Sequence, residues 1–288
     1  MKRIGIIGAG IMAAGMAKNF LAHGHEVTIW NRSQDRLQSI LKAGALSADS
    51  PREVSALSDI VIECVSDDEA SRSVWLGKQG ILEGSDKNKV LITSSSLSLE
   101  WVDELTKLCK EKGFQFLDMP LTGSRAGAEN GTLRLLVGGE SDTLESIRGD
   151  LGSISEKIYH FGPTGSGMRF KLILNSLIGI HMNAVGQAMS LAKKAGIDPK
   201  AFANALIDGN MGPLSPSTKL VLDSENWEDG RVNFAIELLE KDLRYAIKMT
   251  NKYSFTFDLL ETTQADFKIA KDNGLGKFDV TSIKKQFE

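Results

Sequence analysis

The strongest constraint on the fold is an alternation, over the first 162 residues, of short apolar runs with stretches of helical periodicity. Such alternation is typical of βαβ units, in which crossover helices join parallel strands. Several runs are rich in Ile, Val and Leu without polar alternation, as in strands that helices cover on both faces. We therefore predict a doubly wound parallel sheet in residues 1–162. The predicted strands are Ile4–Ile7, Val27–Trp30, Asp59–Val65, Val90–Thr93, Phe114–Leu117, Leu133–Val137 and a weaker Lys157–His160.

The character of the chain changes after Phe161. Gly and Pro residues follow at 162–167, and Met168–Ala195 then runs without proline, which predicts a long helix. A polar segment with Gly and Pro, Gly209–Ser217, is predicted to break the helical pattern. Residues 163–288 are therefore predicted to form an all-helical second domain. Its further predicted helices are Pro199–Asp208, Val232–Tyr253 and Phe257–Asn273.

Composition and charge exclude several classes of protein. With 42% hydrophobic and 25% charged residues, the chain of 288 residues is typical of a globular protein. Its 34 basic and 37 acidic side chains leave no basic excess to attract nucleic acid or an anionic membrane. No apolar stretch approaches the roughly 20 residues that span a bilayer, and glycines interrupt the N-terminus before a signal-peptide core develops, so we expect a cytoplasmic protein. Cys64 and Cys109 are too few for a disulfide framework, and we expect Cys64 in a buried strand and no metal site.

The first predicted strand runs directly into Gly8-Ala9-Gly10-Ile11-Met12-Ala13, ahead of a predicted helix at Ala14–Ala22. In the Rossmann dinucleotide fingerprint, the first glycine allows a tight turn, the second lets the backbone approach the pyrophosphate, and a third small residue packs helix on strand. The helix N-terminus then offers N–H groups to the phosphates. We therefore predict Gly8, Gly10, Ile11 and Met12 as cofactor-binding residues. The alternative is that small residues in a turn only satisfy the backbone geometry.

The second predicted strand ends at Asn31-Arg32-Ser33, where an NAD enzyme usually places Asp or Glu to hold the ribose 2′-OH. Asn31 does not repel an anion, Arg32 can form a charge-assisted fork with a 2′-phosphate, and Ser33 adds a hydroxyl. This pattern predicts a preference for NADP(H) over NAD(H). The alternative is that Arg32 is a solvated charge and that Ser33 caps a helix at Gln34–Leu41.

Five ordered blocks, extending over nearly the whole chain, resemble the β-hydroxyacid dehydrogenases. This family contains 3-hydroxyisobutyrate dehydrogenase, tartronate semialdehyde reductase and the glyoxylate/succinic semialdehyde reductases. The blocks are the glycine loop, Thr93-Ser94-Ser95-Ser96, Asp118-Met119-Pro120-Leu121-Thr122-Gly123-Ser124, Gly165-x-Gly167-x-x-x-Lys171-x-x-x-Asn175 and Lys241-Asp242-Leu243.

The resemblance implies roles for residues in these blocks and a homodimer or homotetramer. It places Ser95 and Ser96 near the nicotinamide end of the cofactor, with Ser96 also at the substrate, and implies that Lys241 closes over the cofactor with Phe234 near it. Val65 and Ser66, beside the third predicted strand, are further candidate cofactor residues. The serines could instead form a capped turn, Lys241 and Asp242 a helix surface pair, and Phe234 part of the core.

The substrate is predicted to be a small molecule that carries a carboxylate. The turn Thr122-Gly123-Ser124 can present N–H groups and two hydroxyls to such a carboxylate. Arg125 is more similar to the glyoxylate/succinic semialdehyde reductases than to the 3-hydroxyisobutyrate branch, and could bind the same group. Alternatively, Arg125 pairs on the surface with Glu129, four residues later.

Reduction of an aldehyde needs a proton donor at its oxygen, because negative charge develops there in the transition state. Lys171 is our candidate, with Asn175 one helical turn later on the same face. We expect a partly desolvated pocket to lower the pKa of Lys171 from about 10.4. The alternative from spacing alone is an amphipathic helix face with solvated cations.

We therefore predict an NADPH-dependent reductase of small aldehyde acids such as glyoxylate or succinic semialdehyde. The alternatives are a 3-hydroxyisobutyrate- or serine-type dehydrogenase, an imine reductase, and a non-catalytic NADP-binding module. Gln187 stands where many relatives have Glu. Asn210-Met211-Gly212-Pro213 could shape the substrate pocket.

Overall fold

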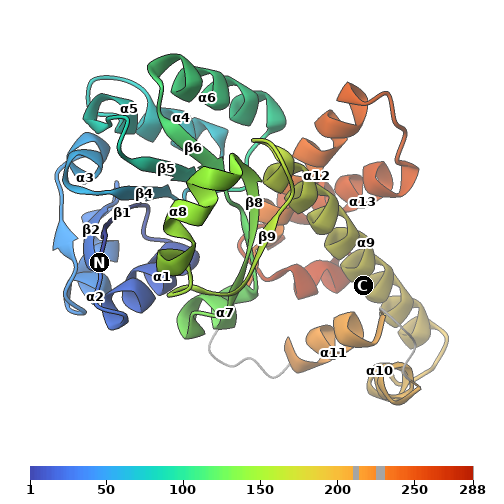
Figure 1. Cartoon of the computed structure of the whole chain (residues 1–288). Coiled ribbons are helices and arrows are strands. Elements are labelled where there is room, and N and C mark those ends of the chain that lie inside the picture. Colours follow the sequence, from blue (N-terminus) through green and yellow to red (C-terminus); the bar gives the residue numbers. More distant parts are fainter. Residues whose placement is uncertain (210–213, 225–230, 288) are drawn as a thin grey trace. The chain divides into compact units, whose positions relative to one another are not determined.

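The computed structural model describes residues 1–209, 214–224 and 231–287 (Figure 1). The chain divides into two compact units, Met1–Lys171 and Leu172–Glu288. Helix α9 (Ser166–Lys194) carries the chain from the first unit into the second. The domain boundary predicted after residue 162 precedes this helix, whereas the two units divide within it.

A nine-stranded sheet forms the centre of the first unit, with strand order β3-β2-β1-β4-β5-β6-β8-β7 and with β9 paired to β8. Strands β1 to β6 run parallel to one another, which confirms the predicted α/β class. The bounds are β1 (Arg3–Ile7), β2 (Glu26–Trp30), β3 (Leu46–Ser47), β4 (Ile60–Glu63), β5 (Val90–Thr93), β6 (Gln115–Asp118), β7 (Leu121–Thr122), β8 (Leu133–Gly139) and β9 (Ser155–His160).

The expectation of an entirely parallel sheet is wrong at one edge. Strand β8 runs antiparallel to both β6 and β7. The chain returns from β6 to β8 through the two-residue β7 and a helix of seven residues, α7 (Ser124–Asn130). Residues 119–132 separate β6 from β8, which is long enough for a parallel crossover, so the antiparallel direction does not follow from the length of the connection.

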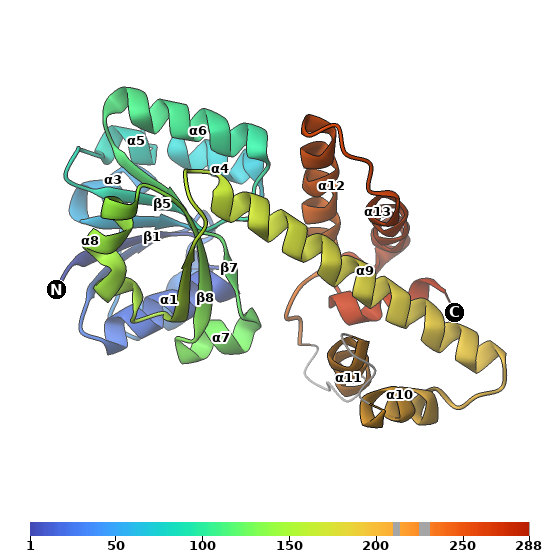
Figure 2. The ribbon, with the colours of Figure 1, turned by 45° about the vertical axis from the view of Figure 1, so that its right-hand side comes forward.

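Helices cover both faces of this sheet (Figure 2). One face packs on α1, α2, α7 and α8 through a continuous apolar cluster, in which Phe20 of α1 and Ile147 of α8 are fully buried. The other face lies against α3, α5 and α6, where Trp101 is fully buried. The bounds are α1 (Ile11–Ala22), η1 (Gln34–Leu37), α2 (Gln38–Leu41), α3 (Pro51–Leu57), α4 (Asp68–Trp75), α5 (Ile81–Gly84), α6 (Leu99–Lys112) and α8 (Ser141–Leu151).

Several of these helices begin where the sequence supplies a capping side chain. Ser50, Asp67 and Ser98 each accept a backbone N–H from the first turn of α3, α4 and α6. By contrast, Cys64 lies one residue beyond β4 and is half-buried, so its predicted place inside a strand is wrong.

The described part of the second unit is helical, as predicted. Its elements are the remainder of α9, α10 (Pro199–Asp208), α11 (Leu214–Ser224), α12 (Ile236–Lys252), α13 (Asp258–Ala270), η2 (Lys271–Leu275) and η3 (Val280–Gln286). The predicted break at Gly209–Ser217 is wrong in its last residues, because α11 begins at Leu214. Pro216 lies in the first turn of α11, where a missing N–H costs little. Residues 210–213 lie outside the described residues. Within the described residues, no helix has the length and apolar character needed to cross a membrane.

Gly15 allows α1 to pack closely on α7. A Cβ added there would lie 2.5 Å from the carbonyl oxygen of Ala128. We expect Gly15→Ala to lower the free energy of unfolding by about 1–3 kcal/mol, as overpacking does. Gly149→Ala is the matched control, because its added Cβ meets no described atom within 4 Å. It should stabilise α8 by up to about 1 kcal/mol. Urea unfolding measures both variants, and equal midpoints would contradict the packing of α1 on α7.

Candidate active site

Predicted site residues of the first unit gather at one edge of the sheet. The glycine loop follows β1, residues 31–33 follow β2, residues 65–66 follow β4 and residues 95–96 follow β5. Because these strands are parallel, their carboxyl ends share the edge at which ligands bind in doubly wound sheets.

The glycine loop has the geometry that a dinucleotide needs. Gly8 has a φ of +113°, and a side chain there would collide with the carbonyl oxygen of Cys64. Its N–H donates to the carbonyl oxygen of Trp30 at 2.9 Å. Gly10 is the N-cap residue of α1, and no described atom lies within 4 Å of an added Cβ. No described side chain caps this N-terminus, so the first N–H groups of α1, from Ile11 and Met12 onward, fit a phosphate group.

Asn31 braces this loop from the end of β2. Its Oδ1 accepts the N–H of Ala9 at 3.1 Å, and its Nδ2 donates to the carbonyl oxygen of Ser33 at 2.8 Å. The side chain of Asn31 therefore shapes the loop. Arg32 and Ser33 are exposed. Ser33 occupies the N-cap position of η1, as the alternative predicted, but its hydroxyl makes no capping hydrogen bond to the described residues of this helix.

A cavity of about 410 Å³ opens beside the glycine loop. Arg125 lines it and lies 3.6 Å from Glu129, so the predicted ion pair is present. Arg36 also lines the cavity, although we did not single it out in the sequence. Its place three residues after Ser33, in the helical turn that follows the end of β2, is the signal that could have found it. The lining residues are Ala9, Gly10, Ile11, Ala14, Gly15, Lys18, Arg36, Ser39, Arg125 and Glu129.

The serines that follow β5 differ in their exposure. Ser95 is 2% exposed, donates its hydroxyl to Glu63 at 2.7 Å and accepts the N–H of Val65 at 2.7 Å. Its side chain therefore links two loops within the protein. Ser96 is half-buried, and Ser66 is exposed.

The predicted substrate turn combines two unusual backbone conformations. Gly123 has a φ of +132°, and Ser124 has a φ of +60°, which is uncommon for a residue with a side chain. Such strain gathers at functional sites. Thr122 is half-buried, and Ser124 is exposed at the start of α7.

Asp118, at the end of β6, fixes the start of α9. Its carboxylate is fully buried and accepts the N–H of Gly165 at 2.6 Å and the N–H of Met168 at 2.7 Å. Side chains at Gly138 or Gly167 would crowd this carboxylate. Lys171, which is half-buried, follows Met168 by three residues, so Asp118 sets the position of its helical turn. We did not predict this role, because the contact joins residues about 50 positions apart.

In the second unit, Asn175 belongs to a buried polar group. Its Nδ2 donates to Asp242 at 2.6 Å, and Lys241 Nζ lies 2.9 Å from the same carboxylate. The Lys241–Asp242 pair is almost fully buried, so the alternative of a surface pair is wrong. Asn175 Oδ1 has no hydrogen-bond partner among the described residues. Asp242 therefore orients the amide so that its oxygen remains available as an acceptor.

Phe234 is half-buried, and its backbone N–H donates to Asp279 at 3.1 Å.

Gln187 donates to Asp266 at 3.3 Å and to Asn183 at 3.3 Å. A glutamate at position 187 would place a second carboxylate against Asp266. This contact explains why an uncharged amide suits the position.

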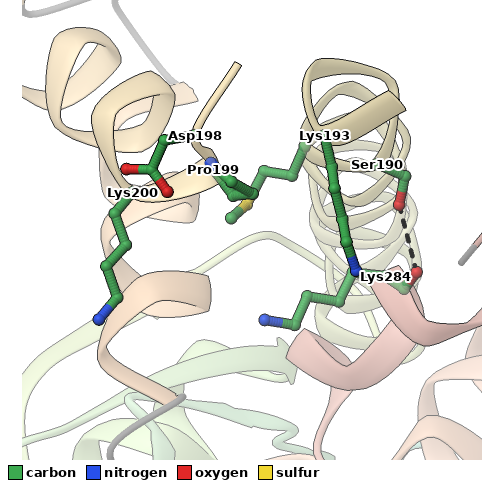
Figure 3. Close-up of a pocket in the computed structure, with 7 residues that line it drawn as sticks. Ser190, Lys193, Asp198, Pro199, Lys200 and Lys284 are labelled. Atoms are coloured by element: carbon green, nitrogen blue, oxygen red, sulfur yellow. Dashed lines mark hydrogen bonds between the residues drawn. The ribbon is translucent and has the colours of Figure 1, made fainter. Parts of the chain in front are cut away.

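A second cavity, of about 250 Å³, lies entirely within the second unit (Figure 3). The hydroxyl of Ser190 donates to the carbonyl oxygen of Lys284 at 3.5 Å and joins α9 to η3 at its wall. None of the predicted site residues lines this cavity. Its lining residues are Met189, Ser190, Lys193, Asp198, Pro199, Lys200 and Lys284.

Two family models match the chain. Residues 3–162 match the NAD binding domain of 6-phosphogluconate dehydrogenase. Residues 165–287 match the NAD-binding model of NADP-dependent 3-hydroxyisobutyrate dehydrogenase.

Individual relatives agree with these models. An uncharacterized oxidoreductase of Synechocystis is 34% identical over 85% of this chain and 84% of that protein. The chloroplastic glyoxylate/succinic semialdehyde reductase 2 of Arabidopsis thaliana is 28% identical over 97% of this chain and 78% of that protein. The solved structure of Mycobacterium tuberculosis 3-hydroxyisobutyrate dehydrogenase with L-serine has a TM-score of 0.84 and 24% identity, and covers 100% of this chain and 99% of that one. This likeness shows the fold.

The chain also matches a larger protein. Cytokine-like nuclear factor N-PAC of Anopheles gambiae is 27% identical over 98% of this chain but 49% of that protein. The chain therefore spans about half the length of this relative.

We expect Asp118→Asn to loosen the start of α9, because an amide nitrogen would face one of the two N–H groups. Burial raises the pKa of Asp118 from 3.8 to about 6. The folded state then binds a proton more readily than the unfolded chain, so stability from this group is present below about pH 4 and is lost as the pH rises through about 6. The stability advantage of wild type over Asp118→Asn should shrink by up to roughly 3 kcal/mol over that range. Urea unfolding between pH 4 and 7 measures it, and a constant difference would contradict the shift.

Proposed function

Because the chain belongs to the β-hydroxyacid dehydrogenase family and is an NAD(P)-dependent oxidoreductase, we propose that it reduces small aldehyde acids with NADPH. The observation that carries this proposal is the pair of polar side chains on α9, Lys171 and Asn175, and the contacts that fix their positions. Lys171 and Asn175 lie four residues apart on this helix, its start is fixed by Asp118, and the amide of Asn175 is oriented by Asp242. A pre-oriented donor and acceptor suit a reaction in which charge develops on a carbonyl oxygen.

In the proposed reaction, Lys171 donates a proton to the oxygen of the aldehyde. The bound cofactor supplies the hydride. The Oδ1 of Asn175 accepts a hydrogen bond from the lysine ammonium or from the product hydroxyl, and so orients whichever group carries the proton. In the opposite direction, the neutral amine of Lys171 accepts the proton of a hydroxy acid.

We assign the carboxylate of the substrate to Ser96 and to the turn Thr122-Gly123-Ser124. The strained φ of Ser124 supports this assignment, because it holds an exposed hydroxyl at the start of α7. The similarity to the Arabidopsis glyoxylate/succinic semialdehyde reductase supports short aldehyde acids as the substrate class. The homodimer or homotetramer stays a prediction.

The preference for NADPH rests on two arginines. Arg32 follows β2, and Arg36 lines the cavity beside the glycine loop. Two guanidinium groups on this side of the loop suit the 2′-phosphate of NADPH better than the two hydroxyls of the NADH ribose.

The parent enzyme should oxidise NADPH, followed at 340 nm, with at least one of glyoxylate, succinic semialdehyde, tartronate semialdehyde and methylmalonate semialdehyde. We expect Lys171→Ala to lower kcat by about 10²- to 10⁴-fold, the usual contribution of a general acid. Lys171→Arg should stay nearly as slow, because guanidinium keeps the charge but holds its proton.

Lys219→Ala is the matched control, since this lysine is 62% exposed on α11 and pairs only along its own helix with Asp223 among the described residues. Its kcat should equal that of the parent. Full turnover by Lys171→Ala would disprove the proton donor. NADPH binding without turnover of any aldehyde acid would disprove the substrate class and favour an imine reductase or a non-catalytic module.

Arg36→Ala and Arg32→Ala should each lower kcat/KM for NADPH by about tenfold, because each removes a charge-assisted hydrogen bond to the 2′-phosphate. The values for NADH should change less than twofold. Arg148→Ala, which removes an exposed arginine paired with Glu145 on α8, should change neither. The proposal fails if the parent uses NADH as efficiently as NADPH.

A further inference from the structure

Glu63 is a buried acid at the ligand edge of the sheet, and none of the motifs discussed above includes it. It is the last residue of β4 and lies in register between Ile7 of β1 and Thr93 of β5. Its side chain is fully buried. The residue after Ile7 is Gly8, so Glu63 stands between the glycine loop and the turn that follows β5.

The carboxyl group of Glu63 accepts hydrogen bonds from hydroxyls at the end of β5 and in the turn that follows it, and the side chains of Trp75 and Ser71 on α4 also interact with it. Thr93 Oγ1 donates to one oxygen at 2.6 Å, and Ser95 Oγ donates to the other at 2.7 Å. The Ser95 hydroxyl in turn accepts the N–H of Val65 at 2.7 Å. One carboxyl group therefore connects the loop after β4 with the loop after β5.

Burial of the Glu63 carboxyl group costs free energy of folding. No ion pair joins Glu63 to a basic side chain among the described residues, and burial raises the pKa of its carboxyl group. An apolar residue would avoid the desolvation of a carboxyl group, since buried acids are expensive unless they are well paired. A purely structural strand end would be served better by valine or isoleucine. We therefore look for the advantage of a buried glutamate at this position in the ligand that the two loops bind.

The position along the sheet indicates which part of the ligand is concerned. In a doubly wound fold the pyrophosphate lies at the glycine loop after β1, and the adenosine ribose lies toward the end of β2. The arginines assigned to the 2′-phosphate are on that side. The other nucleoside must then extend over β4 and β5, where the loops held by Glu63 lie.

We propose that Glu63 is a positioning residue for the nicotinamide half of the cofactor and acts through Ser95 and the backbone at Val65. This inference rests on the cofactor placement of the proposed function and does not depend on the identity of the aldehyde.

The test compares the whole cofactor with its adenosine half. Dissociation constants of NADPH and of 2′,5′-ADP are measured by calorimetry for the parent, Glu63→Gln, Ser95→Ala and the double variant. We expect each single substitution to weaken NADPH binding about 3- to 10-fold, the effect of one or two lost hydrogen bonds. Binding of 2′,5′-ADP should change less than twofold. The double variant should be no weaker than the weaker single variant, because both break the same link.

Replacing a carboxyl group by an uncharged amide adds no negative charge, so it cannot weaken binding of an anionic ligand through charge, and weaker binding reports lost positioning. Glu104→Gln is the matched control. Its carboxylate is exposed on α6 and pairs with Arg72 at 2.6 Å, and its removal should change neither dissociation constant.

Equal weakening of NADPH and 2′,5′-ADP would overturn the inference and show a general loss of structure. Unchanged NADPH binding in Glu63→Gln would also overturn it. If Glu63→Gln does not fold, Ser95→Ala decides by the same comparison of the two ligands. Because no aldehyde enters these measurements, a parent that binds NADPH but reduces no aldehyde acid would disprove the proposed substrate class and leave this test valid.

Discussion

The candidate chemistry depends on two hydrogen bonds, in which the Asp118 carboxylate accepts backbone N–H groups at the start of α9. They join the carboxyl end of β6 to the first turn of the helix that carries Lys171. Room for them is made by Gly138 on β8 and Gly167 on α9, where a Cβ would crowd the carboxylate. A sheet is among the most rigid parts of a domain, so a helix anchored to a strand end presents its side chains from a fixed origin.

Much of the architecture could be predicted from the sequence because its causes are local. Apolar runs predicted the longer strands, and local signals also mark the ends of α6, which begins after the capping residue Ser98 and ends before the left-handed Gly113. The direction of β8 could not be predicted, because an apolar run does not show which strand it pairs with or in which direction. The same holds at the site. The glycine loop is visible in a short motif, whereas the roles of Glu63, Asp118 and Asp242 depend on contacts between residues 30 or more positions apart.

Three buried carboxyl groups have a common function in this molecule. Glu63 organises hydroxyls, Asp118 organises backbone N–H groups, and Asp242 organises an amide and an ammonium group. Each costs desolvation energy that an apolar side chain would not. In return, each removes rotational freedom from groups beside it. This exchange of stability for fixed geometry is the usual condition of a site that must be arranged before its ligand arrives.

Gly8 and Gly10 belong to one motif but differ in the space that the protein leaves for a side chain. Gly8 is required by the protein itself, because its backbone angle and the Cys64 carbonyl leave no room for a side chain. Gly10 faces open space among the described residues, so these residues leave room for a side chain there. Under the cofactor placement proposed above, a variant that no longer bound the cofactor would still need the first glycine for its fold but would tolerate a side chain at the second. The two glycines therefore separate a requirement of the fold, at Gly8, from a requirement of the proposed ligand, at Gly10.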